Sequence, residues 1–315
     1  MIGRSRIRGI AAILFLIGCA GGTIELAQPR GQVGTPLIHV DSNLVTVPVS
    51  VTDSSGRPVR DLRLGDFQLL EDGNPEALTS LSEPGQTPIE LALILDLSDS
   101  IRPRFELERE AASRFLVRVL RPEDRFTIFS IGARPGLIQQ RTSNIQDGLR
   151  SLALVPASGG STAFYDTIVQ AARSMASVRM PGSRRVAVVL SDGEDNNSES
   201  WHLAGALEEV QRADCIFYSI NPAGPSIRLN SVSVEGQEGM SRLAGQTGGV
   251  AFVPERTDEL DPIFDRIAVE LRAQYLLEYY SNQGRGGAFR HISVNIPSRP
   301  GLRIHARLGY YTSQE

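Results

Sequence analysis

The pattern of apolar and polar positions divides the chain into a middle stretch and two ends of a different character. Between residues 87 and 272, short apolar runs alternate with longer segments in which apolar residues recur every three or four positions. The short runs predict buried strands at residues 91–95, 126–131, 186–190, 216–220 and 250–253. The longer segments predict helices at residues 104–120, 145–152, 164–178, 201–213, 238–247 and 258–272. This order is typical of an α/β fold, a doubly wound, mostly parallel sheet with helices on both faces.

The two ends of the chain show strict alternation instead. Val45, Val47, Val49 and Val51 alternate with polar residues, which predicts a half-buried antiparallel strand. Pro48, on the polar side, predicts an edge position for this strand. Near the other end of the chain, a similar strand-like pattern occurs at residues 275–280, 291–296 and 302–308.

Neither end alone supplies enough strands for a stable core, so we expect both to form one antiparallel β-sandwich module. The α/β domain is then an insertion in this module, which is tolerated where two chain positions lie close together at a surface. The predicted boundaries are residues 37–84 for the first part of the module, 85–273 for the inserted domain, and 274–313 for the second part.

The first residues have the features of an export signal. Arg4, Arg6 and Arg8 precede an apolar stretch at residues 10–17 that is too short to cross a bilayer. Residues 16–19, Leu-Ile-Gly-Cys, resemble the bacterial lipobox, which implies a signal peptide over residues 1–18 and a lipid on Cys19. Residues 19–36, rich in small residues, then predict a flexible tether. We expect an exported protein anchored by lipid to the outer membrane; the alternative is a periplasmic or secreted protein in which Cys19 is incidental.

Composition narrows the possible functions. The 315 residues are 41% hydrophobic and 22% charged, as in an ordinary globular protein. The net charge of −4 argues against nucleic acid as a partner, because phosphate binding needs a basic face. The sequence has no lysine, which excludes a P-loop lysine and a Schiff-base lysine. If Cys19 carries a lipid, Cys215 is left alone and no disulfide forms.

Oxygen-bearing side chains follow two of the predicted buried strands. Asp96, Ser98 and Ser100 follow residues 91–95, and Asp192 follows residues 186–190. Thr162 comes after a pair of glycines and just before a predicted helix. Because sites in doubly wound sheets form at the carboxyl ends of strands, these segments are candidates to meet at one edge. Carboxylate and hydroxyl oxygens suit a hard divalent cation.

This combination resembles the metal-ion-dependent adhesion site of von Willebrand factor A domains, over residues 87 to 272. The resemblance implies that Asp96, Ser98, Ser100, Thr162 and Asp192 surround Mg²⁺, or Mn²⁺ or Ca²⁺. It also implies that a carboxylate from an Asp or Glu of a partner protein is the last ligand, with no reaction catalysed. The whole chain is similar to a bacterial group of exported A-domain proteins, whose partners are poorly defined.

Several neighbouring residues have simpler explanations. Asp99, Glu194 and Asp195 are interpreted as solvated acids or as groups behind the metal ligands. Asp166, in the first turn of a predicted helix, interacts favourably with the helix dipole. For Trp201 we expect a packing or surface role.

Two alternative functions stay open. A buried strand ending in Asp96 is also similar to haloacid-dehalogenase phosphatases, which use a nucleophilic Asp and a second Asp two residues later. Ser98 occupies that second position and cannot serve as the acid, and the chain has no lysine to hold a phosphoryl group. The second alternative is a scaffold subunit of a larger envelope complex.

Overall fold

The computed structural model describes residues 43–98, 104–156, 159–178, 180, 182–224, 231–282 and 286–313. Residues 42–315 form one unit. The predicted signal peptide and tether, Cys19 and Ser100 lie outside the described residues. No helix in the described ranges is both long and apolar enough to cross a membrane.

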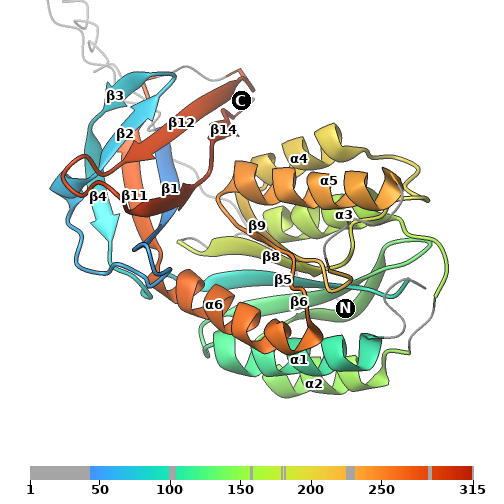
Figure 1. Ribbon diagram of the computed structural model, residues 1–315. Helices are drawn as coiled ribbons and strands as arrows, with labels where there is room; N and C mark the ends of the chain where they lie inside the picture. The colour runs from blue at the N-terminus through green and yellow to red at the C-terminus, as the bar shows by residue number, and fades with distance from the viewer. Residues whose placement is uncertain are drawn as a thin grey trace, which may run out of the picture. The chain divides into compact units, whose positions relative to one another are not determined.

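A six-stranded sheet forms the centre of the α/β part (Figure 1), with the strand order β10-β9-β8-β5-β6-β7. The strands are β5 (Ile89–Asp96), β6 (Arg125–Ile131), β7 (Gly136–Thr142), β8 (Arg184–Leu190), β9 (Cys215–Ile220) and β10 (Ala251–Phe252). All neighbours pair in parallel except β7, which runs antiparallel to β6. The prediction of a mostly parallel sheet is confirmed.

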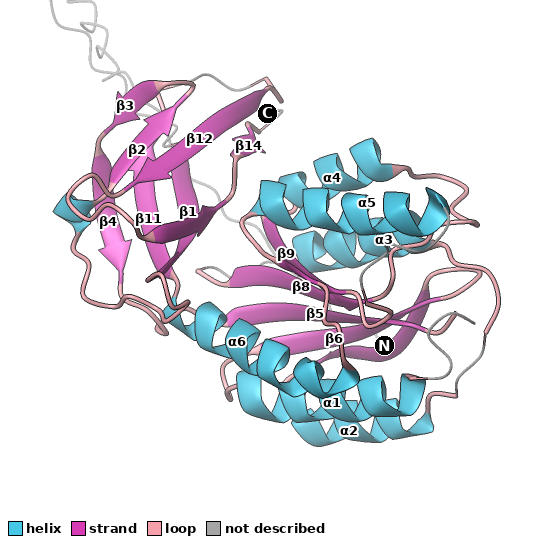
Figure 2. Ribbon diagram, viewed as in Figure 1, coloured by secondary structure: helices cyan, strands magenta, loops and turns pink. Residues whose placement is uncertain are grey.

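Helices cover both faces of this sheet (Figure 2). One face packs against α1 (Phe105–Val119), α2 (Ile145–Leu154) and α6 (Leu260–Ala273), the last preceded by a short 3₁₀ turn at Thr257–Glu259. The other face packs against α3 (Phe164–Ser177), α4 (Leu203–Arg212) and α5 (Ser231–Thr247). Every residue of β5 is buried, which explains why its residues 91–95 are an unbroken apolar run.

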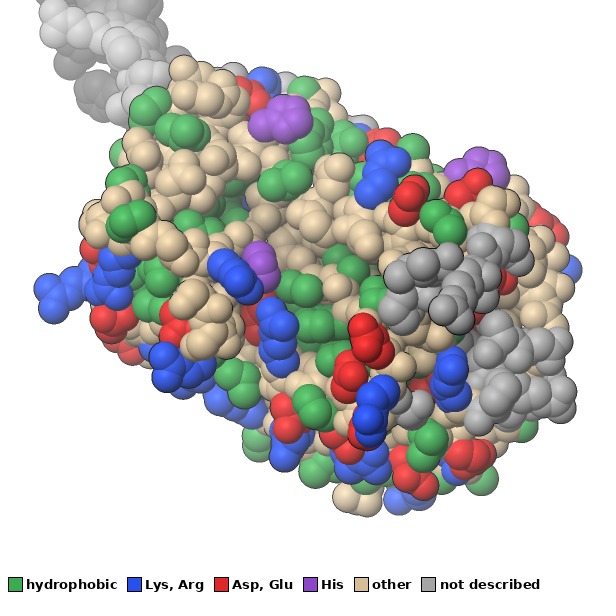
Figure 3. All heavy atoms as spheres, viewed as in Figure 1, with side chains coloured by type: hydrophobic (Ala, Val, Ile, Leu, Met, Phe, Trp, Pro, Cys, Tyr) green, Lys and Arg blue, Asp and Glu red, His purple; other side chains and the backbone are tan. Residues whose placement is uncertain are grey.

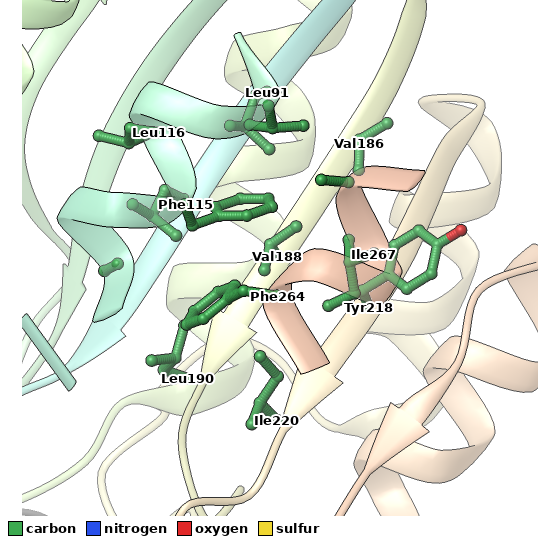
Figure 4. Close-up of a cluster of buried hydrophobic side chains, with 14 of the residues drawn as sticks. Leu91, Phe115, Leu116, Val186, Val188, Leu190, Tyr218, Ile220, Phe264 and Ile267 are labelled. Carbon is green, nitrogen blue, oxygen red and sulfur yellow. The ribbon is translucent and has the colours of Figure 1, made fainter. Parts of the chain in front are cut away.

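The core on the α1 and α6 side is closely packed (Figure 4). Phe115 of α1 and Phe264 of α6 stack with their ring centroids 4.7 Å apart, above Val188 of β8. These aromatic rings join the two helices to each other as well as to the sheet. On the surface above them, basic and acidic side chains are interspersed (Figure 3), and Arg114 and Arg118 of α1 pair with acids of α6.

Strands from both ends of the described chain form two further four-stranded sheets, β13-β1-β11-β4 and β14-β12-β2-β3. The early strands are β1 (Leu44–Thr52), β2 (Gln68–Glu71), β3 (Asn74–Glu76) and β4 (Leu78–Ser82), with a 3₁₀ turn at Leu64–Asp66. The late strands are β11 (Tyr275–Tyr280), β12 (Phe289–Asn295), β13 (Arg303–Ala306) and β14 (Gly309–Tyr311). β1 pairs with β11, and β2 pairs with β12. The expected joint assembly of an antiparallel β-sandwich from both ends is therefore confirmed, while the exact domain boundaries stay a prediction.

The alternation in β1 places the valines in the core as predicted, but the strand does not lie at the predicted edge of its sheet. Val45, Val47, Val49 and Val51 are all buried in the core between the two sheets. The edge position predicted from Pro48 is wrong, because β1 lies between β11 and β13. The proline is tolerated because the ladder with β13 begins only at Val49, so that Pro48 pairs with β11 alone.

Two elements of the α/β part differ from the sequence analysis. No strand is predicted at Gly136–Thr142, where β7 forms the edge of the central sheet. Helix α5 begins at Ser231 rather than at Glu238. Both differences concern segments whose own sequence lacks a strong apolar period.

Candidate metal centre

The carboxylate of Asp96 is fixed at the carboxyl end of β5. Its Oδ1 accepts a hydrogen bond from the backbone N–H of Ser98 at 2.8 Å, so the chain turns directly after the strand. Its Oδ2 accepts a hydrogen bond from the hydroxyl of Ser191 at 2.6 Å. Asp96 is 1% exposed and Ser98 is 4% exposed. Protein donors to both oxygens orient this carboxylate in advance of any ligand.

Ser191 is a residue of this site to which the sequence analysis assigns no role. It is fully buried at the end of β8 and joins β8 to β5 through Asp96. Its hydroxyl oxygen also accepts a hydrogen bond from the N–H of Gly193 at 2.9 Å, which shapes the loop that carries Asp192. The serine before the Asp-Gly pair was the signal available in the sequence.

Asp192 lies in a loop packed closely against α5. The Asp192 side chain is 4% exposed, and its Oδ1 accepts a hydrogen bond from the N–H of Glu194 at 3.1 Å. Gly193 has φ +79°, and a Cβ there would lie 2.5 Å from the carbonyl oxygen of Gly236 on α5. Glycine is therefore required both at Gly193 in the loop and at Gly236 in α5, where the loop and the helix touch.

Thr162 is held between the loops that follow β5 and β8. The N–H of Gly159 donates to the carbonyl of Leu97 at 2.8 Å, which joins the threonine loop to the Asp96 loop. The N–H of Thr162 donates to Oδ1 of Asn196 at 2.8 Å, and the Thr162 carbonyl accepts from the N–H groups of Asn196 and Asn197 at 3.0 Å. Together with the Ser191–Asp96 bond, these contacts tie all three segments to one another.

Two acids near the site have more defined roles than the sequence analysis gave them. Asp195, interpreted there as solvated or behind the ligands, accepts the N–H of Phe164 at 2.8 Å and so caps the first turn of α3. Asp166 accepts hydrogen bonds from the N–H groups of three consecutive residues, 199–201. Both carboxylates hold the loop after Asp192 against α3. This loop in turn provides the hydrogen-bond partners of Thr162. The Cζ atom of Arg173 lies 4.7 Å from the ring centroid of Trp201, so Trp201 has the expected packing role.

The electrostatics of the site favour a cation. Burial raises the pKa of Asp96 to about 6; the hydrogen bonds from Ser191 and Ser98 oppose this effect, and the charge of Asp192 adds to it. Burial also raises the pKa of Glu108, on α1, to about 8, with the charge of Asp96 as the next cause. Buried acids that repel one another are stabilised in their charged form by a bound cation.

The donor set therefore fits a hard divalent cation. Asp96, Ser98, Thr162 and Asp192 lie on segments that hydrogen-bond to one another at the carboxyl edge of the sheet, while Ser100 lies outside the described residues. Within the described ranges, no group of three or more His, Cys, Asp and Glu side chains is arranged to hold a metal ion. A site of the predicted kind takes most of its direct ligands from hydroxyl groups, which a group of His, Cys, Asp and Glu side chains does not include. The role of the five predicted residues as metal ligands therefore stays a prediction.

Residues 91–194 match the family model of the von Willebrand factor type A domain. The chain contains a von Willebrand factor type A domain. The matched segment of this A domain extends from β5 to the loop after β8, and so includes the Asp96, Thr162 and Asp192 segments. No curated protein matches the chain.

Solved structures similar to this chain include three bacterial proteins. BatB from Bacteroides thetaiotaomicron, described as a conserved hypothetical protein, is 21% identical, with 57% of this chain and 97% of that chain covered and a TM-score of 0.45. The von Willebrand factor type A protein from Catenulispora acidiphila is 12% identical, with coverage of 87% and 75% and a TM-score of 0.48. The corresponding domain of the pilus tip protein Mfa5 from Porphyromonas gingivalis is 12% identical, with coverage of 58% and 94% and a TM-score of 0.46.

Proposed function

We propose that the A domain binds a divalent cation, Mg²⁺ or alternatively Mn²⁺ or Ca²⁺, and through it an acidic side chain of a partner protein. Asp96, Ser98, Ser100, Thr162 and Asp192 would hold the cation. The observation that carries this proposal is the set of hydrogen bonds that link the three oxygen-bearing loops, from Ser191 to Asp96 and from Gly159 to Leu97.

The residue types explain why the outcome is binding rather than catalysis. Bound there, the cation would supply a coordination position for a carboxylate of the partner. Ser98, Ser100 and Thr162 are neutral donors, so they leave more positive charge on the ion than a set of carboxylates would. Domains of this family usually act in protein–protein interaction.

The alternative of a phosphatase receives no support from the position of Asp96. A nucleophilic carboxylate must reach the phosphorus with a free oxygen. Asp96 is 1% exposed, and its two oxygens accept hydrogen bonds from Ser191 and Ser98. Its fixed, buried orientation suits a group that positions other ligands.

Titration of the purified protein with Mg²⁺ tests the proposal. Wild type should release or absorb heat on calorimetric titration, and its melting temperature should rise with Mg²⁺, because the folded state alone binds the ion. The variants Asp96→Ala and Asp192→Ala should lose both responses. Asp61→Ala serves as the control, since Asp61 pairs with Arg299 on the β-sandwich and should keep both responses. A wild-type protein without heat or thermal shift would overturn the proposal.

A partner experiment separates adhesion from a scaffold role. Pull-down from cross-linked, intact cells should recover a partner in the presence of Mg²⁺, and a chelator should abolish the recovery. The same partner recovered equally with the chelator and with Asp192→Ala would favour the scaffold alternative.

We further propose that the protein is exported and held at the outer membrane by a lipid on Cys19. Cys19→Ser should move the protein from the membrane fraction to the soluble fraction, while Cys215→Ser should not. A Cys19→Ser variant that stays in the membrane fraction would refute the anchor and leave the A domain proposal untouched.

A further inference from the structure

A cavity of about 290 Å³ lies where the β-sandwich meets the A domain. Because alternate residues of a strand point to opposite faces, the residues of β1 and β11 that do not enter the sandwich core form one wall of this cavity. These residues are Leu44, Thr46, Pro48, Leu276 and Glu278. The opposite wall includes the start of β8, the end of α4 and the start of β9. The cavity therefore lies at the amino edge of the central sheet, whereas the candidate metal centre lies at the carboxyl edge.

Arg185, near the start of β8, brings a positive charge to this cavity without an acidic partner. Its Nε donates to the carbonyl oxygen of Met175 at 3.2 Å, and its Nη1 donates to that of Ala213 at 2.9 Å. Among the residues that the structure describes, no carboxylate forms an ion pair with this guanidinium, and its Nη2 makes no hydrogen bond. Neutral carbonyl oxygens leave the charge of the guanidinium uncompensated, so an anion bound in the cavity would be stabilised by it.

Gln211, in the last turn of α4, adds a polar group that lacks a partner. It is 7% exposed, and it lines both this cavity and an adjacent cavity of about 230 Å³. Within the described ranges, its side-chain amide forms no hydrogen bond. A buried amide without a partner is costly, and a ligand that accepts a hydrogen bond from it removes this cost.

The remaining lining residues decide which kind of anion fits. Arg307 pairs with Asp214 and donates from Nη2 to the carbonyl oxygen of Thr46 at 2.7 Å, while Glu278 accepts a hydrogen bond from Ser80. Three arginines and two acids line the cavity, so the positive charges exceed the negative charges by one. The apolar lining residues are Leu44, Pro48, Ile216 and Leu276. This combination favours a ligand with a single negative charge and an apolar chain over a dianion.

We propose that this cavity is a binding site for a small amphiphile with one carboxylate group, of the kind that a medium-chain fatty acid represents. Arg185 and Gln211 bind the carboxylate, and the apolar side chains of β1, β9 and β11 contact the chain. Ligand pockets of roughly 300 Å³ or more, with an apolar lining and a few polar groups, are common at the junctions of domains. The inference is independent of the proposed metal centre, which lies at the other edge of the sheet.

Calorimetric titration of the purified protein with octanoate tests the inference. EDTA is present throughout, so that a bound cation at the candidate metal centre cannot take up the carboxylate. Wild type should bind octanoate saturably. Octanol, which has the chain without the charge, and acetate, which has the charge without the chain, should each give a dissociation constant at least tenfold higher. Octyl phosphate, a dianion at pH 8, should also bind at least tenfold more weakly, and tighter binding of this probe would overturn the choice of a carboxylate.

Variants of the two polar groups assign the binding to this cavity. Arg185→Gln and Gln211→Leu should each raise the dissociation constant for octanoate at least tenfold, and Arg185→Lys, which keeps the charge, should have a smaller effect. Arg125 is the matched control, because its guanidinium at the start of β6 also donates to two backbone carbonyls, those of Pro122 at 3.1 Å and Asp124 at 2.7 Å. It does not line the cavity, so Arg125→Gln should keep the wild-type dissociation constant within twofold.

The outcomes separate this inference from the proposed function. Wild type that binds no octanoate, or binds octanol as tightly, overturns the inference and leaves the Mg²⁺ proposal untouched. Unchanged binding in both Arg185→Gln and Gln211→Leu also overturns it. If Arg185→Gln does not fold, Gln211→Leu and the comparison of octanoate with octanol on wild type decide. Asp192→Ala should bind octanoate as wild type does, and loss of binding in that variant would place the ligand at the candidate metal centre instead.

Discussion

At the scale of single residues, the site depends on hydrogen bonds that position the oxygen donors. Ser191 is the clearest example, since its hydroxyl donates to Asp96 and accepts from Gly193. It thereby connects two strands and two loops of the candidate centre. Removing it should disturb both the fold of the edge and the affinity for a cation.

We predict that Ser191→Ala lowers the free energy of unfolding by about 1–3 kcal/mol, because it leaves the buried Asp96 oxygen without its donor. Urea unfolding measures this value, and repeating it with Mg²⁺ should show a smaller stabilisation by the ion than in wild type. Ser219→Ala is the control. Ser219 is 1% exposed on the neighbouring strand β9, and its hydroxyl has no hydrogen-bond partner in the described structure. Equal losses in the two variants would contradict the positioning role of Ser191.

The sequence was sufficient to predict which oxygen-bearing segments meet at one edge of the sheet, but not how these segments are held together. Asp96 and Asp192 follow apolar runs, and such runs end at one edge of a parallel sheet. The contacts of Ser191 and Asn196 depend on distances between loops that are far apart in the sequence. A single sequence does not contain those distances, so these two residues were missed.

At the scale of secondary-structure elements, close packing requires glycine at some positions within helices but not at others. Gly148 of α2 is buried, and a Cβ at this position would lie 2.6 Å from the ring of Phe126 on β6. Phe126 is fully buried in the core, so its ring has no room to move away. Gly245 of α5, in contrast, has no atom within 4 Å of such a Cβ.

These two glycines predict opposite effects of the same substitution. Gly148→Ala should lower the free energy of unfolding by about 1–3 kcal/mol, because the extra methyl group overpacks the contact of helix and sheet. Gly245→Ala should raise it by about 0.5–1 kcal/mol, because alanine favours the helix and meets no obstacle. Chemical denaturation of both variants measures the values. A stabilised Gly148→Ala protein would show that α2 packs less closely on β6 than the structure indicates.

The elements that the sequence analysis missed are those that tertiary contacts stabilise. The first turns of α5 contain valine, serine and glycine, which have weak helix propensity. They are helical where Ser233 hydrogen-bonds to Glu194 and Gly236 meets the Asp192 loop. Strand β7 is a partly exposed edge strand whose register with β6 shifts twice, so it has no regular alternation to detect.

At the scale of the whole molecule, the chain leaves the β-sandwich after β4 and returns to it at β11. Ser82 at the end of β4 lies opposite Leu276 of β11 in an antiparallel ladder. Only Gln274 separates α6 from β11. The two crossing points of the chain are thus neighbours in one sheet, as expected for a domain inserted into a pre-existing module.

This adjacency predicts that the β-sandwich folds without the inserted A domain. Replacing residues 84–274 by Asn-Gly would join the β4 and β11 ladder through a two-residue hairpin turn. The core between the sheets would be retained, including the contact of Tyr275 with Phe67, whose ring centroids are 5.5 Å apart.

The shortened protein should show β-type circular dichroism and one cooperative thermal transition. Its melting temperature should be lower than that of the full chain, because the bond from Leu308 to Gln246 and the ion pair from Arg307 to Asp214 are lost. Residues 43–83 alone are the control and should stay unfolded, since β1 and β2 would lack their partners β11 and β12. If the shortened protein is unfolded while an isolated A domain of residues 85–273 is folded, the sandwich requires the insert, and the insertion model is wrong.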